Sequence, residues 1–283
     1  MGAGSWKNWN IKRRHWRMFS CTIYRRQVMT FLEKSIVKKE ILEMVRTSRL
    51  LIWTVVCMII GIVSPLTAYY LPDIISAFGA TENIAISFGK ITYQDSVEQY
   101  IKNFGQIGTI VLILMMMGSV AGEKVDGSVQ FLLVRPVGTI SILVAKFVSL
   151  LVLLVTGLLG SMLTMGFYTW YLFPGFPGFR FIYANLFLFL YFFAIGIITI
   201  AISASVRKPI LAGIGTLGVW LLASIMGAIR SIGPFSFAKL PEQVIQTIEG
   251  FPFEWQPIVG TAILLCLFIL AGTMLFNRWE PND

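Results

Sequence analysis

One short stretch, GEKVDGSVQFLLVRPVGTISILVAKF at residues 122–147, carries acids, bases, glycines and a proline between two strongly apolar segments. Its carboxylates, Glu123 and Asp126, could take part in acid–base or metal chemistry only with suitable partners. The histidine of the chain, His15, lies far away in a basic segment, so no His–carboxylate cluster is indicated. GSVAGEK contains a glycine and a lysine but lacks the spacing of a phosphate-binding loop. We therefore expect this chain to bind no ATP phosphate itself.

Composition indicates a membrane protein. Of the 283 residues, 56% are hydrophobic and 13% are charged, so the chain lacks the polar surface that a soluble domain of this length needs. The formal net charge of +9 comes largely from Lys and Arg that precede the first apolar run. This asymmetry is typical of membrane orientation and argues against nucleic-acid binding. The three cysteines lie far apart and predict neither a metal site nor a disulfide framework.

The elements that must position residues 122–147 are six apolar segments, each long enough to cross a bilayer as a helix of about 20 residues. None of them contains Lys, Arg, Asp, Glu or His, which disfavours an ion-driven carrier, because such carriers place ionisable groups within the membrane. The predicted fold is therefore an all-α integral membrane protein. Its spans are expected at approximately residues 50–71, 104–121, 147–170, 181–205, 209–229 and 257–276.

The distribution of basic residues predicts the orientation of these spans. Eighteen of the 23 Lys and Arg residues lie in the amino-terminal segment, the 122–146 connection, the Arg207-Lys208 connection and the carboxyl-terminal tail. We therefore expect both termini and the 122–146 connection to be cytoplasmic. Aromatic residues that suit the outer interface under this topology are Tyr69, Tyr70, Trp170, Tyr171 and Trp255.

A second candidate element precedes the first span. Over Val37 to Ser48, a narrow apolar stripe lies on one helical face and basic or acidic side chains cover the others. This pattern predicts a helix that lies at the inner membrane surface, with a plain juxtamembrane basic cluster as the alternative. The apolar side chains of the predicted interfacial helix are Val37, Ile41, Met44 and Val45.

The 122–147 stretch itself predicts a short amphipathic helix. Apolar residues recur in VDGSVQFLLV at helical spacing, and Glu123 and Asp126 lie near its expected amino-terminal end, where acids are favoured. Pro136 is expected to end the helix. A helix of this kind, held between two spans, could either dock a cytosolic partner or lie on the membrane as a connector. The residues alone leave both interpretations open.

The same stretch resembles the signature of type 2 ABC transporter permeases, exporter subunits with six spans. The shared pattern is E-x-x-x-G-S-x-x-x-L-L-x-x-P-(V/I)-x-x-x-x-(I/L)-x-x-A-K, which here begins at Glu123 and ends at Ala145-Lys146. KKEILEMVRTSRLLIW and SPLTAYYLPDI are similar to the same family, so the resemblance covers nearly the whole chain. The amino-terminal extension that contains Trp6, Trp9 and Trp16 is longer than the family pattern requires.

The resemblance implies that the second-to-third connection is a coupling helix that sits in a cleft of a separate ATPase subunit. It also implies two ATPase copies, which bind ATP and Mg, and a second permease chain that is either identical or related. The amino-terminal amphipathic helix would lie on membrane lipid. The residues expected to couple to the ATPase are Glu123, Asp126, Gly127, Phe131, Leu132, Leu133, Arg135 and Pro136.

We therefore predict a non-catalytic permease subunit of an ATP-driven exporter, with no cofactor or metal of its own, in a bacterial plasma membrane. The uncharged spans favour an amphipathic or apolar cargo, such as an antimicrobial peptide, a drug or a lipid. The alternative is an ATPase-independent carrier or a membrane sensor or anchor, and a membrane enzyme ranks third. The predicted organisation is a basic segment with the interfacial helix (1–49), the permease domain (50–277) and a cytoplasmic tail (278–283).

Overall fold

The computed structural model describes residues 35–79, 91–127, 139–252 and 254–277, and within these ranges the regular elements are helices. Six of them are long and apolar enough to cross a membrane, which confirms the predicted all-α membrane fold. The spans are Arg49–Asp73, Tyr93–Val125, Ser141–Leu172, Gly178–Ser205, Pro209–Gly227 and Gln256–Leu275.

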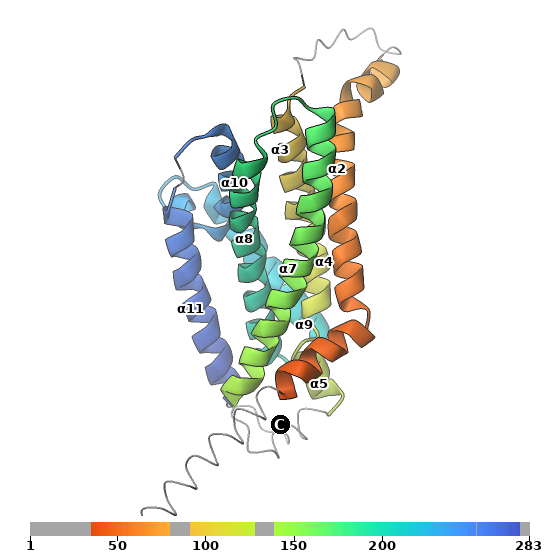
Figure 1. Ribbon diagram of the computed structural model, residues 1–283. Helices are drawn as coiled ribbons and strands as arrows, with labels where there is room; N and C mark the ends of the chain where they lie inside the picture. The colour runs from red at the N-terminus through yellow and green to blue at the C-terminus, as the bar shows by residue number, and fades with distance from the viewer. Residues whose placement is uncertain (1–34, 80–90, 128–138, 253, 278–283) are drawn as a thin grey trace, which may run out of the picture.

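The labelled helices follow one another along the chain, after a first helix over residues 35–46 (Figure 1). Those of the first half are α2 (Arg49–Gly79), α3 (Tyr93–Asn103), η1 (Phe104–Gly108), α4 (Thr109–Met116) and α5 (Ala121–Val125). Those of the second half are α7 (Thr139–Leu172), α8 (Gly178–Ser205), α9 (Pro209–Gly227), η2 (Gly233–Phe235), η3 (Phe237–Lys239), α10 (Leu240–Glu249) and α11 (Gln256–Asn277).

Helix α8 forms the centre of the bundle and packs against α4, α7, α9, α10 and α11. Within its most apolar window 67% of the residues are buried, whereas the corresponding share is 11% for α11, which therefore lies at the periphery. Helices α2 and α7 run side by side over most of their length (Figure 1). Their close approach requires glycine, because a Cβ atom at Gly157 would lie 2.1 Å from Nε1 of Trp53.

The second span begins earlier than the sequence predicted. We expected it to start at residue 104, but the helix already begins at Tyr93 and continues without interruption through η1, a single π-helical turn, into α4. Thr92 and Asp95 form a capping box at its start. The prediction excluded this part because Glu98 and Lys102 make it polar, although polarity does not prevent it from being helical.

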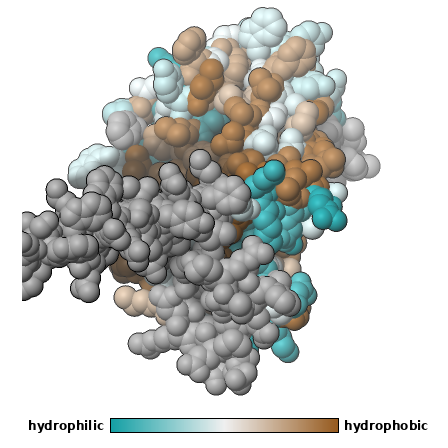
Figure 2. All heavy atoms as spheres, turned by 60° about the horizontal axis from the view of Figure 1, so that its bottom comes forward, coloured by the Kyte–Doolittle hydropathy of each residue, from teal (hydrophilic) through white to brown (hydrophobic). Residues whose placement is uncertain are grey.

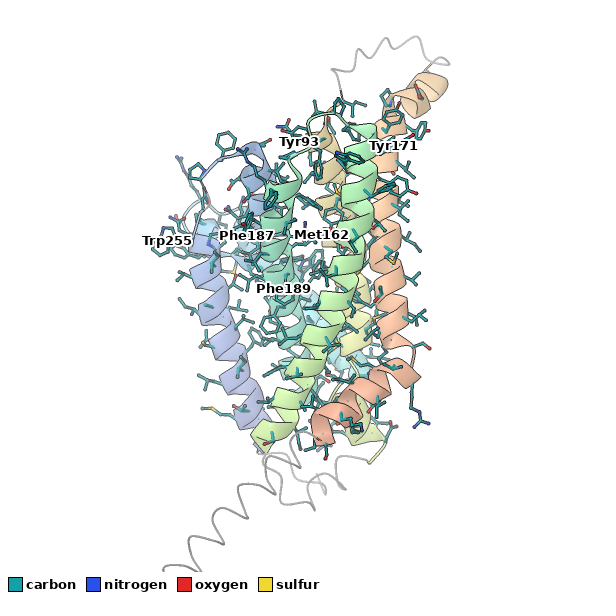
Figure 3. The ribbon with its side chains drawn as sticks, viewed as in Figure 1. Tyr93, Met162, Tyr171, Phe187, Phe189 and Trp255 are labelled. Atoms are coloured by element: carbon teal, nitrogen blue, oxygen red, sulfur yellow. The ribbon has the colours of Figure 1, made fainter. Side chains whose placement is uncertain are left out.

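The two ends of the bundle differ in chemistry. At one end, which we call the charged end, the helix over residues 35–46 lies across the base of the bundle beside α5 and the start of α7 (Figure 1). Figure 2 shows a patch of hydrophilic side chains on this end. At the opposite end, which we call the aromatic end, lie the side chains of Tyr93, Tyr171 and Trp255 (Figure 3).

A short helix between the fifth and sixth spans closes the aromatic end. In the stretch LPEQVIQTIEG, Pro241 and Gly250 stand where these residues are favoured, at the first turn and just after the end of a short helix, and α10 forms between them. Gly250 has a φ of 88°, a left-handed conformation that favours glycine after a helix. The buried side chains of Leu240, Val244 and Ile248 attach α10 to the bundle, where it contacts α8 and α3.

Candidate functional site

Five charged side chains meet at the charged end of the bundle, and we call this cluster the charged junction. It joins three elements that are distant in sequence: the helix over residues 35–46, α5 and α7. Lys146, Glu40 and Glu123 retain only 2%, 7% and 8% of their accessible surface, so the centre of the cluster is shielded from solvent. The members of the charged junction are Lys39, Glu40, Glu43, Glu123 and Lys146.

Lys146 is the hub of the junction. Its Nζ lies 3.2 Å from Oε1 of Glu123 and 3.3 Å from Oε2 of Glu40. Lys39 completes the cluster from the amino-terminal helix, because its Nζ donates to Oε1 of Glu123 at 2.9 Å and lies 3.4 Å from a carboxylate oxygen of Glu43. Glu123 therefore accepts from two lysines on two elements, and one carboxylate connects α5 to both of them.

The buried face of the amino-terminal helix explains how Glu40 enters this cluster. Ile36, Glu40 and Met44 are the buried residues and recur every fourth position, so they share one face of the helix. Of the predicted apolar side chains, Met44 lies on this face, Val37 and Ile41 are half-buried and Val45 is 56% exposed. The face that contacts the bundle is thus centred on a carboxylate that has a buried lysine as its partner.

Helix α5 is also fixed to the end of α8. The backbone N–H groups of Val120 and Ala121 donate to Oγ of Ser203 at 3.2 and 2.9 Å, and that hydroxyl donates to the carbonyl oxygen of Met117 at 2.8 Å. Lys124 donates from its Nζ to the carbonyl oxygens at the end of α8, including that of Val206 at 3.3 Å. A displacement of α5 must therefore move α8 or break these bonds.

Three of the predicted coupling residues lie within the described part of the chain. Glu123 belongs to the charged junction, Asp126 is exposed, and Gly127 has a φ of 70°, so it ends α5 in a left-handed turn that favours glycine. The other predicted coupling residues lie outside the described residues and stay predictions: Phe131, Leu132, Leu133, Arg135 and Pro136.

Electrostatics favour the charged form of the exposed lysine in the junction. Partial burial lowers the pKa of Lys39, but its hydrogen bond to Glu123 and the charges of Glu123, Glu40 and Glu43 outweigh this, so its pKa is raised above the ordinary value. Carboxylate oxygens of Glu40, Glu43 and Glu123 lie within 4.8 Å of one another, a spacing that could hold a cation. The two lysine ammonium groups already lie among these oxygens. The arrangement therefore suits a set of ion pairs that holds three elements together, rather than a catalytic or metal centre.

Sequence reasoning identified Glu123 but missed the partners that give it a role. Lys39 and Glu40 were assigned to the polar faces of an interfacial helix, and Lys146 was noted only as the last residue of the motif. Glu123 and Lys146 are the first and last positions of that motif, and the fold places their side chains in contact. The sequence signal for this pair was an acid, Glu123, and a base, Lys146, at the two ends of a motif that connects the second and third spans.

The sequence matches the profile of the family described as ABC-2 family transporter protein over residues 34–262, and the chain belongs to this family. It is therefore a multi-pass membrane permease component of an ABC transporter, a kind of subunit that is typically non-catalytic and associates with an ABC ATPase. The chain is also similar to the uncharacterized transmembrane protein YxlG of Bacillus subtilis strain 168. The two are 27% identical over 257 residues, which cover 87% of this chain and 97% of that protein.

Proposed function

We propose that this permease exports an amphipathic or apolar cargo and that the charged junction transmits ATP-driven movement from a separate ATPase to the spans. The observation that carries this proposal is the buried contact of Lys146 with Glu123 and Glu40, because it connects the start of the predicted coupling segment to α7 and to the amino-terminal helix. Buried charge pairs tolerate little separation, so a movement of one element is passed to the others.

The proposed sequence of events starts at the coupling segment, residues 122–135. Closure of two ATPase subunits around ATP and Mg displaces this segment, which the second-to-third connection presents to them. The displacement reaches α8 through Ser203 and Lys124, and it reaches α7 and the amino-terminal helix through Glu123. The spans then shift as semi-rigid bodies between two arrangements. A second permease chain, identical or related, forms the other half of the path.

The proposed orientation places the charged end in the cytoplasm. The bias of Lys and Arg toward the connections at this end supports it, as do Tyr171 and Trp255 at the aromatic end, which suit a membrane–water interface. Leu42 and Val45 of the amino-terminal helix are 49% and 56% exposed and would contact lipid of the inner leaflet.

Labelling of single cysteines in intact cells tests the orientation. Cys21 and Cys266 are first replaced by serine, whereas Cys57 is fully buried and is retained. Both Gln94 and Asp126 are exposed, at opposite ends of the second span. Gln94→Cys should react with a membrane-impermeant maleimide, and Asp126→Cys should react only after the membrane is permeabilised. The reverse pattern would overturn the orientation and the coupling proposal with it.

Co-purification tests the function. The permease is expressed together with candidate ABC ATPases from its own organism and is isolated by a tag on the permease alone. The expected result is a complex of equal amounts of the two proteins that hydrolyses ATP, whereas the permease alone shows no turnover. ATP hydrolysis by the pure permease at transporter rates, or the absence of any ATPase from the complex, would contradict the proposal.

A further inference from the structure

The second span carries a polar face toward the exterior of the bundle, at a depth where the exposed side chains of α7 are apolar. Glu98, Lys102 and Gln106 recur every fourth residue and are all exposed, with Lys102 61% and Glu98 49% accessible at their side chains. Nζ of Lys102 lies 2.6 Å from Oε1 of Glu98, so the upper part of this face is electrically neutral. We call Glu98, Lys102 and Gln106 the polar face.

Hydrogen bonds to two neighbouring spans show how deep this face lies. Nδ2 of Asn103 donates to Oγ of Ser64 at 2.9 Å, and the hydroxyls of Tyr100 and Ser161 lie 3.0 Å apart. Ser64 is fifteen residues from Arg49 at the base of α2, a helical rise of about 22 Å. On α7, Ser161 is likewise fifteen residues from Lys146, which lies near the start of that helix. Because the hydrocarbon layer is about 30 Å thick, Asn103 and Tyr100 lie roughly 8 Å below its outer boundary.

Gln106 is the deepest member of the polar face, one turn below Asn103 and thus about 12 Å below the outer boundary. Among the described residues no side chain or backbone group bonds its amide. Lys102 has a long side chain that can extend toward the interface, but a glutamine at this depth cannot reach it. An amide in hydrocarbon without a hydrogen-bond partner is strongly unfavourable, so lipid is an unsuitable neighbour for this side chain.

Helix α7 shows what a lipid-facing surface of this protein looks like at the same depth. Its exposed residues at that level, Val155, Leu159 and Leu163, are 43%, 50% and 69% accessible and are all apolar. The polar face of the second span therefore reflects a different environment. The second span lies on another side of the bundle, because α7 runs at the front of the view in Figure 1 and α3 and α4 lie behind it.

The π-helical turn η1 helps to present this glutamine. A π-helical turn contains one residue more than an α-helical turn, and here both Gln106 and Ile107 are exposed within it. From Ile107 onward the exposed side chains of this part of the span are apolar, with Ile107, Ile110 and Leu114 51%, 45% and 55% accessible. The exposed side of the span thus changes from polar to apolar at η1.

We propose that the polar face lines a water-filled vestibule that is open to the outside and receives the uncharged or zwitterionic polar part of an amphipathic cargo. The apolar part of the cargo would contact Ile107, Ile110 and Leu114 below it. The proposal rests on the export function and orientation proposed above. Its chemistry follows from the face itself, because an amide and a compensated ion pair offer hydrogen bonds without a net charge.

Reagent access from outside tests the vestibule. In the variant without Cys21 and Cys266, Gln106→Cys is treated in intact cells with membrane-impermeant trimethylammonioethyl methanethiosulfonate. Leu159→Cys on α7 is the matched control, because Leu159 lies nearer to the outer boundary than Gln106 and still faces lipid. We expect Gln106→Cys to react at least tenfold faster than Leu159→Cys. Equal rates would place Gln106 in lipid and overturn the proposal, and so would a spontaneous disulfide between two Gln106→Cys chains, which would indicate a subunit contact.

The charge of the reagent tests the proposed neutrality. At Gln106→Cys, the cationic reagent and anionic sulfonatoethyl methanethiosulfonate should react at similar rates after correction for their rates with free thiol. Adding Lys102→Gln leaves Glu98 without its counter-ion, and at low salt this should shift the ratio about threefold toward the cation. An unchanged ratio would show that the pair does not face the vestibule. Failure of ATPase co-purification leaves these rates unaffected, so the two proposals fail separately.

Discussion

The two ends of the bundle bury polar groups in different ways. At the charged end, five ionised side chains form the charged junction at the boundary of the membrane. Toward the aromatic end and in the middle of the bundle, neutral groups connect the spans in pairs, such as Ser96 with Thr169 at 3.0 Å and Tyr191 with Thr109 at 3.1 Å. Nε1 of Trp220 also donates to the Tyr191 hydroxyl, at 2.8 Å.

The location of each kind of contact accounts for this difference. Neutral hydrogen bonds satisfy polar groups within hydrocarbon without the desolvation penalty of ions, so they suit a fixed register between spans. Buried ion pairs at the boundary tolerate little separation, so in the proposed mechanism the charged junction passes a movement of one element to the others. The neutral hydrogen bonds should keep the spans that they connect moving as a unit.

Removal of the hub of the junction should have the largest effect. Lys146→Met leaves the carboxylates of Glu40 and Glu123 buried with one fewer partner, a loss of about 3–5 kcal/mol. The melting temperature of the purified protein, measured by intrinsic fluorescence, should fall by roughly 10 °C. Glu40→Gln added to Lys146→Met should recover part of this loss, because it removes one of the two carboxylates that lost Lys146 as a partner.

The matched control for this substitution is Lys102→Met, which also breaks an ion pair. Lys102 is 61% exposed at its side chain, so its pair with Glu98 should contribute less than about 1 kcal/mol. Similar melting temperatures for the Lys146→Met and Lys102→Met proteins would contradict the claim that the junction is buried and structural.

The coupling segment should give the next largest effect, on binding rather than on folding. Leu133→Asp places a charge in the predicted apolar contact with the ATPase, and loss of such an anchor costs about 2 kcal/mol or more, roughly thirtyfold in affinity. The variant should insert and fold but lose ATPase co-purification, whereas Leu133→Ile should retain it. Normal ATPase binding and transport by a Leu133→Asp/Arg135→Glu protein would identify the segment as a connector only.

The sequence was informative where one physical effect dominates. Six spans could be predicted because an apolar run of about twenty residues has no other stable environment, and α10 could be predicted because Pro241 and Gly250 mark helix ends. The full extent of the second span could not be predicted, because Glu98 and Lys102 were assigned to the connection that precedes it. Helix α3, which carries these residues, is polar on a side that we propose faces water rather than lipid.

The candidate site shows the same limit. Glu40 was assigned to a solvated face because helical periodicity indicates which residues share a face but not what that face contacts. Its partner Lys146 is more than a hundred positions away, and only the fold brings their side chains within 3.3 Å. Pairs of this kind depend on tertiary contacts that a single sequence does not specify.

A smaller effect should come from the neutral hydrogen bonds between the spans. Tyr191→Phe removes the hydroxyl that Trp220 and Thr109 contact, which leaves a partly buried indole N–H without its acceptor. The expected loss is about 1–3 kcal/mol in the free energy of unfolding, measured from denaturation in mixed micelles. Tyr168→Phe is the control, because among the described residues its hydroxyl has no hydrogen-bond partner, and this variant should be near neutral. Equal losses would show that the neutral contacts do not hold the spans.

The smallest effect should come from Lys39, the other lysine of the charged junction. Its side chain is 43% exposed, so after Lys39→Met water can still solvate part of the carboxylates it contacts, and the loss should stay below about 1 kcal/mol. A raised pKa in the folded state means that Lys39 stabilises the protein fully at pH values below the unfolded pKa. This contribution is lost only as the pH rises through the higher folded value. The difference in melting temperature between the Lys39→Met protein and the parent should therefore be small and constant from about pH 6 to pH 9. The prediction would be wrong if Lys39→Met lowered the melting temperature as much as Lys146→Met, or if the difference changed across this pH interval. Lys39, rather than Lys146, would then be the main partner of the junction carboxylates.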